Sequence, residues 1–96
     1  MTPDVTPLLL EAVLLAALET PCGITGALAR ARTLTPAPLP ALERDETVRH
    51  ALARYVREYW IQVLPSPGSR PRYHLTGLGE QRLLWHQQRG TLKAPK

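Results

Sequence analysis

The sequence predicts a small, mainly helical protein with one short β-hairpin, in the order helix, helix, helix, hairpin, helix. Its 96 residues suffice for one modest core, and 44% of them are apolar. Four segments have the composition or the apolar spacing of helices. Two short strand-like segments flank PSPGSRP, whose glycine and prolines suit a turn and limit pairing to a short hairpin.

The first predicted helix is apolar on every side. Thr6 is a good N-cap and Pro7 a good first helical residue. From Leu8 to Leu18 nearly every residue is apolar. A helix of this kind is covered on more than one side, and in so short a chain a second subunit can supply the second cover. We therefore expect Leu10 and Leu14 to lie at a dimer interface.

The second predicted helix runs from Ile24 to Arg32, and an extended link follows it. Residues 33–40, TLTPAPLP, hold three prolines at alternate positions, which forbid a helix and favour a polyproline-like path. Pro40 can then begin a short helical turn that ends at Glu43. Cys22 is the single cysteine, so no intramolecular disulfide can form and a reducing compartment is expected.

The third predicted helix, from about Thr47 to Glu58, has the clearest pattern. We expect Asp45 or Glu46 to cap its start. An apolar stripe with helical spacing is formed by Val48, Ala51, Leu52, Tyr55, Val56 and Tyr59, and the opposite side carries Arg49, His50, Ala53, Arg54 and Arg57. A helix with one packed side and one basic side suits insertion into a nucleic-acid groove.

The hairpin strands are expected at Trp60–Leu64 and Arg72–Leu75. Thr76 is expected to cap a last helix that ends near Gly90. We therefore expect a single domain over residues 1–90 and a flexible basic tail over residues 91–96.

The charge is unevenly distributed along the chain. Residues 1–46 carry three arginines and six acids, a net charge of −3, whereas residues 47–96 carry a net charge of +7. This pattern favours one electropositive side and an anionic partner, although a solvated basic face without a partner is the alternative. The apolar run of the first helix is too short to span a membrane and lacks the basic start of a signal peptide, so we expect a cytoplasmic protein.

The segments TVRHALARYVREYWIQV and RYHLTGLGEQRL resemble the end of a PadR-type or MarR-type winged helix-turn-helix transcriptional regulator. Such proteins have a run Tyr-x-Leu-Thr-x-x-Gly-x-x-x-Leu after the hairpin, and here its positions are Tyr73, Leu75, Thr76, Gly79 and Leu83. The resemblance covers roughly residues 8–86. It implies a winged helix-turn-helix fold and the binding of double-stranded DNA.

The sequence departs from this pattern in several places. Arg49 stands where a tyrosine is common, which alters a possible DNA contact, and the link from Thr33 to Asp45 is longer than the usual short turn. Tyr59 stands where such regulators often have glycine, so we expect no left-handed turn there and a helix that continues directly into the strand. Three acids, Glu43, Asp45 and Glu46, lie where the third helix would approach phosphates. They would repel DNA, or they are helix-start residues that face away from it.

The resemblance implies that the third helix enters the major groove. Arg49 and His50 are then the expected base contacts, and the remaining residues would contact phosphates, a thymine methyl group or the minor groove. The expected DNA-binding residues are Thr47, Arg49, His50, Arg54, Arg57, Ser69, Arg70 and Arg72. If about six of these charges meet phosphates, the affinity should fall by around 10³ between about 50 and 200 mM salt.

A homodimer is expected to form through the first and last helices. Leu83, Leu84 and Trp85 are consecutive, so they cannot all face one core, and we expect Leu84 or Trp85 to be exposed in a monomer. Regulators of the PadR and MarR types are similar in pairing through terminal helices. Alternatively, Trp85 packs over the base of the hairpin.

The sequence therefore predicts a small dimeric DNA-binding transcriptional regulator. The alternative is a winged-helix protein-interaction module or complex subunit that does not bind DNA. We expect no enzyme activity and no cofactor, because the single cysteine has no neighbouring base and no carboxylate pair or phosphate-binding loop is present. We also expect no metal site, because the three histidines and the cysteine lack ligand spacing.

Overall fold

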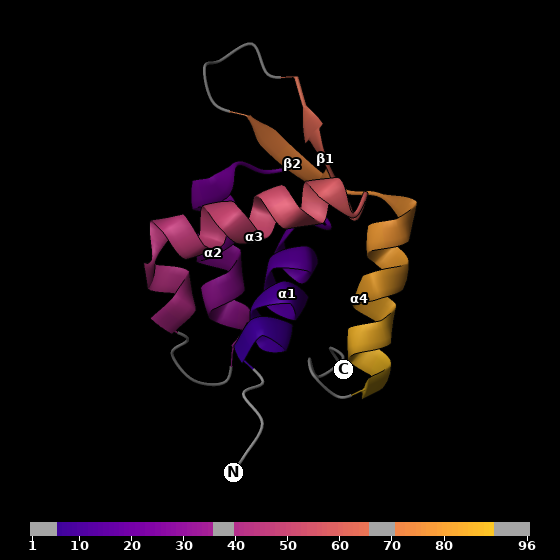
Figure 1. Cartoon of the computed structure of the whole chain (residues 1–96), viewed down its shortest axis with the longest axis horizontal. Helices are drawn as coiled ribbons and strands as arrows, with labels where there is room; N and C mark the ends of the chain where they lie inside the picture. Colours follow the sequence, from indigo (N-terminus) through magenta and orange to yellow (C-terminus); the bar gives the residue numbers. More distant parts are fainter. Residues whose placement is uncertain (1–5, 36–39, 66–70, 90–96) are drawn as a thin grey trace.

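A computed structural model describes residues 6–35, 40–65 and 71–89, and its elements follow the predicted order (Figure 1). The chain forms helices α1 (Thr6–Ala17) and α2 (Ile24–Leu34), a 3₁₀ turn η1 (Pro40–Glu43), helix α3 (Asp45–Arg57), strands β1 (Ile61–Leu64) and β2 (Arg72–Leu75), and helix α4 (Gly77–Arg89). The mainly helical class with one antiparallel hairpin is confirmed.

Helix α1 forms the centre of the core. Every residue from Leu10 to Leu18 is at most 8% exposed. Figure 1 shows α1 between α2 and α4, with α3 crossing near the hairpin end, and α1 contacts α2, α4 and η1. The expectation that Leu10 and Leu14 face a second subunit is corrected here, because elements of the same chain bury both side chains. Within the described residues, no helix is both long and apolar enough to cross a membrane.

Helix α3 begins two residues earlier than its apolar pattern suggests. Arg44 is the N-cap residue and makes no side-chain capping hydrogen bond. Asp45 and Glu46 therefore lie in the first turn of the helix. Their expected role as N-caps is wrong, although a negative charge in a first turn still interacts favourably with the helix dipole.

The end of α3 also differs from expectation, because Tyr59 adopts a left-handed conformation with φ of 62°. The amide of Tyr59 donates to the Val56 carbonyl (3.0 Å), and the amide of Trp60 donates to the Tyr55 carbonyl (3.0 Å). These two bonds form the motif that commonly closes a helix around a left-handed residue. The Trp60 ring also packs on the Tyr55 ring, with centroids 5.8 Å apart. The helix therefore does not continue directly into β1.

The hairpin is anchored to the connection between α1 and α2. Strands β1 and β2 pair antiparallel, from Ile61 opposite Leu75 to Leu64 opposite Arg72. On the other edge of β2, Tyr73 and Cys22 exchange two backbone hydrogen bonds of 2.8 and 3.1 Å. The hairpin projects beyond the helices at the top of Figure 1. The backbone pairing of Tyr73 with Cys22 fixes the direction in which it projects.

Helix α4 is capped and held in two ways. Thr76 caps its start as predicted, because its hydroxyl oxygen accepts a hydrogen bond of 3.1 Å from the Gly79 amide. Further along, α4 is joined to α1 by Glu11, which is only 4% exposed. Glu11 accepts a hydrogen bond of 2.7 Å from Arg82 and contacts the ring of His86, which is completely buried.

Candidate nucleic-acid interface

The core-facing residues of α3 determine which of its side chains reach solvent. Val48, Leu52 and Tyr55 are buried at helical spacing and fix the orientation of the helix. The opposite side is exposed and carries most of the charges of the helix. Its exposed residues are Asp45, Glu46, Arg49, His50, Ala53, Arg54 and Arg57.

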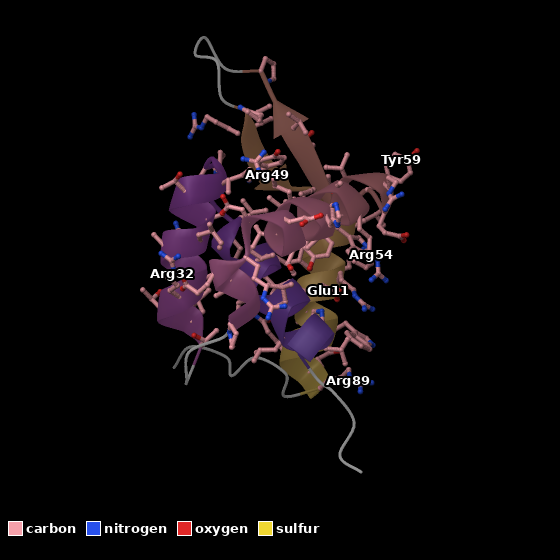
Figure 2. All side chains as sticks on the ribbon, turned by 60° about the vertical axis from the view of Figure 1, so that its left-hand side comes forward. Glu11, Arg32, Arg49, Arg54, Tyr59 and Arg89 are labelled. Carbon is pink, nitrogen blue, oxygen red and sulfur yellow. The ribbon has the colours of Figure 1, made fainter. Side chains whose placement is uncertain are left out.

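The helical period distributes the predicted DNA-binding residues of α3 over three lines. His50 and Arg57 lie along the middle of the exposed side, seven residues apart. Arg49 lies on the flank that faces α2 and β2, and Arg54 lies on the other flank (Figure 2). Thr47 shares the flank of Arg54 and is half-buried. The basic side chains thus cover the width of the exposed side.

An open hollow lies beside α3, between the start of α2 and strand β2. Thr25 and Gly26 line it from α2, and Tyr73 lines it from β2. Arg49 and Asp45 line it from α3, one helical turn apart. Sequence patterns alone did not reveal this hollow, because three segments that are distant in the chain form it.

The hairpin contributes one described basic residue, Arg72. Its Nη2 donates a hydrogen bond of 2.9 Å to the Pro21 carbonyl, and the side chain remains exposed. Arg72 lies opposite Leu64 at the loop end of the paired strands, and this bond holds its guanidinium beside the connection between α1 and α2. The expected contacts of Ser69 and Arg70 fall outside the described residues.

The three acids near the start of α3 have different surroundings. Glu43 pairs with Arg32 of α2 through two hydrogen bonds of 3.2 and 3.4 Å. Its carboxylate is thereby partly neutralised and fastens η1 to α2. By contrast, Asp45 and Glu46 are exposed and have no hydrogen-bond or ion-pair partner within residues 6–35, 40–65 and 71–89.

The described residues offer little support for a nucleophilic cysteine or a metal site at this surface. Burial raises the pKa of the Cys22 thiol, so the thiol stays protonated at neutral pH and is a poor nucleophile. In the part of the chain that the structure describes, no three histidine, cysteine or acidic side chains gather as a metal site would require.

Three packed helices, a two-stranded hairpin beside the exposed third helix, and a closing helix define the winged helix-turn-helix class. The sequence matches no protein-family model and no curated protein. Among solved structures, the fold is similar to that of a PadR family transcription regulator from hypervirulent Clostridium difficile R20291. The TM-score is 0.68 over 83% of this chain and 84% of that chain, with 21% sequence identity. The likeness establishes the winged-helix fold.

Proposed function

We propose that this protein is a DNA-binding transcriptional regulator in which α3 inserts into the major groove. One observation carries the proposal: Arg49, His50, Arg54 and Arg57 are all exposed on α3 and have no side-chain partner among the described residues. By contrast, Arg32 of α2 pairs with Glu43. The fold of a PadR family transcription regulator supports the same function.

The position of each side chain suggests its role. Arg49 and His50 lie in the first half of α3, the part of a recognition helix that reaches base edges, and arginine binds guanine through two hydrogen bonds. Arg54 and Arg57 lie farther along and would contact phosphates, which position the protein without selecting a sequence. Arg72 would contact the DNA backbone from the loop end of the hairpin strands.

A titration of a labelled random duplex, followed by fluorescence anisotropy at about 50 and 200 mM salt, tests this proposal. With the three phosphate contacts of Arg54, Arg57 and Arg72, the affinity should fall by about 40-fold between these two concentrations. Arg54→Ala and Arg57→Ala should each weaken binding and each lower the salt slope by about one. Arg89→Ala removes the same charge from the far end of α4 and serves as the control. Absence of binding at the lower salt concentration would refute the proposal.

The alternative function is a protein-interaction module without DNA binding. The exposed acids Asp45 and Glu46 favour it, because they repel phosphates but are compatible with a mixed-charge protein surface. The same titration separates the two functions, since a protein-interaction module would not bind the random duplex even at low salt.

We further propose that the protein forms a homodimer through α4. Leu84 is 51% exposed, as expected of one residue in the Leu83–Trp85 run, and Leu78 on the same helix is 54% exposed. Trp85 is half-buried, with the guanidinium groups of Arg82 and Arg89 stacked against its ring at 4.0 and 4.5 Å. Leu84→Glu should convert a dimer into a monomer in light scattering. A wild-type chain of monomer mass at high concentration would exclude the dimer.

A further inference from the structure

We infer that Asp45 is a specificity-determining residue of the proposed DNA interface and that it selects cytosine close to the guanine bound by Arg49. This inference rests on the proposed function. It gives a role in recognition to an acidic residue whose charge would otherwise repel a polyanion.

Among the described residues, the only structural effect of Asp45 is its favourable negative charge in the first turn of α3. It is exposed at the first position of α3, whereas the N-cap position is occupied by Arg44. Its carboxylate has no hydrogen-bond or ion-pair partner within the described part of the chain, unlike that of Glu43, which pairs with Arg32. Glu46 places a second negative charge in the same turn, so the helix keeps one favourable charge when Asp45 is replaced. Helix stability therefore does not depend on Asp45 alone.

Asp45 and Arg49 lie on the same side of α3. Residues four apart on a helix are surface neighbours, with Cβ atoms roughly 5–6 Å apart. Both side chains line the hollow between α2, α3 and β2, and both are exposed. A base edge that meets Arg49 therefore lies within one or two base steps of Asp45, because successive bases are about 3.4 Å apart along a strand.

The major-groove edges of the bases determine what a carboxylate can accept there. Cytosine presents the N4 amino donor, whereas guanine and thymine present only hydrogen-bond acceptors. Adenine presents its amino donor beside the N7 acceptor, which repels a carboxylate. An ionised aspartate is therefore stabilised by cytosine and opposed by the other bases. Its contribution to specificity lies largely in exclusion of the wrong bases.

Arg49 supplies the complementary half of this recognition. Its guanidinium suits the O6 and N7 acceptors of guanine. The Arg49 guanidinium as donor and the Asp45 carboxylate as acceptor lie one turn apart. Together they would require a guanine and a cytosine within one or two base steps of each other. The pair also limits the repulsion of phosphates, because the charge of Arg49 offsets that of Asp45 in the same hollow.

Selection of binding sites from a random duplex library tests the inference. The wild-type chain should enrich cytosine at one fixed position near a guanine, with a preference of about tenfold or more over other bases. Asp45→Asn should lose this preference and shift the position toward adenine, because asparagine pairs with the N6 and N7 atoms of adenine. Glu58→Gln removes the same charge from the exposed C-cap residue of α3 and should leave the selected sequence unchanged.

Two results would overturn the inference, and they differ in what they say about the proposed function. If Asp45→Asn binds every sequence more tightly and still selects the wild-type motif, Asp45 is only a repulsive charge and DNA binding by α3 stands. If the wild-type chain enriches no duplex at all, the proposed function fails together with the inference.

Discussion

Tyr59 illustrates how a single residue can hold a backbone conformation that its own side chain disfavours. A left-handed conformation costs an L-residue with a Cβ atom about 1–2 kcal/mol. Tyr59 adopts it because its own amide and that of Trp60 donate the hydrogen bonds that close α3, and because the Trp60 ring packs on Tyr55. The Tyr59 side chain is 72% exposed and contributes little burial in return.

Replacement of Tyr59 by glycine should therefore stabilise the protein. We expect Tyr59→Gly to raise the free energy of unfolding by about 1 kcal/mol, because glycine adopts the left-handed region without strain. Tyr59→Ala is the matched control, since alanine removes the aromatic ring but keeps the Cβ atom. Urea unfolding measures both variants. An equal gain in the alanine variant would show that the exposed ring, and not the backbone, is unfavourable.

Two glycines in the first turn of α4 provide a second test at the scale of single residues. A Cβ atom on Gly79 would lie 1.9 Å from the Trp60 carbonyl oxygen, whereas one on Gly77 would have no heavy atom within 4 Å. Gly79→Ala should thus lower the unfolding free energy by about 2 kcal/mol or more, because either α4 or the α3–β1 connection must move. Gly77→Ala should be neutral or stabilising by up to about 1 kcal/mol. Thermal unfolding of the two variants decides, and equal melting temperatures would contradict the close packing.

At the scale of secondary-structure elements, a buried polar cluster fixes α4 to α1. Arg82 is shared between two contacts: its Nε bonds Glu11, and its guanidinium stacks between Trp85 and Trp60, at 4.0 and 4.9 Å from the ring centroids. Trp60 follows α3, so the cluster connects α1, α4 and the end of the proposed recognition helix. Arg82 thereby links Trp85 to Trp60, which immediately precedes β1 at the base of the hairpin. Of the neighbouring residues Leu84 and Trp85, Leu84 is the more exposed.

The histidine of this cluster should make stability depend on pH. Burial lowers the pKa of His86 below its ordinary value of 6.5, although its contact with Glu11 acts in the opposite direction. The nearby Arg82 and Arg89 charges also lower this pKa. Protonation would leave the buried Nδ1 as a donor without a partner among the described residues. The unfolded chain therefore takes up this proton more readily than the folded chain.

It follows that the stability contributed by neutral His86 is complete above about pH 6.5 and is lost as the pH falls through the pKa of the folded state. Urea unfolding between about pH 5 and 8 should show this decline in the wild-type chain. His86→Gln should show a flatter profile between these pH values. His50→Gln, which alters an exposed histidine, should retain the wild-type slope. The same slope in all three proteins would refute a role for His86.

At the scale of the whole molecule, the two proposed binding surfaces are separate. Helix α3 and the hairpin lie toward one end of the molecule, and the end of α4 lies away from them (Figure 1). Leu84 lies in the second half of α4, so a dimer formed through it would leave the exposed side of α3 accessible. Two copies could then contact DNA together, with a spacing set by the dimer.

The order of the elements was predictable because each one has a local signal. Apolar spacing, the Thr76 cap and the turn-forming segment between the strands are all features of neighbouring residues. The errors have two origins. The burial of Leu10 and Leu14 depends on how elements that are distant in the sequence, α2, η1 and α4, surround α1. The N-cap at Arg44 and the left-handed turn at Tyr59 are local, and there the residue preferences of the sequence pointed to another conformation.

The candidate site was predictable only in part. The basic residues of α3 were recognisable from the helical period, whereas the hollow beside Arg49 and Asp45 requires three separate segments to meet. The Glu11 cluster did have a signal that the sequence analysis missed. A lone acid within an apolar helix needs a basic partner when it is buried, and Arg82 and His86 stand one helical turn apart in α4.

The most direct test of the central claim is to map the amides of the isotope-labelled protein by NMR while a DNA duplex of about 20 base pairs is added. If α3 inserts into the major groove, the largest shift changes should fall on residues 45–57 and on β2, with smaller ones at the start of α2. Residues at the end of α4, around Arg89, should change little. Changes confined to α4, or none at low salt, would contradict DNA binding by this winged helix.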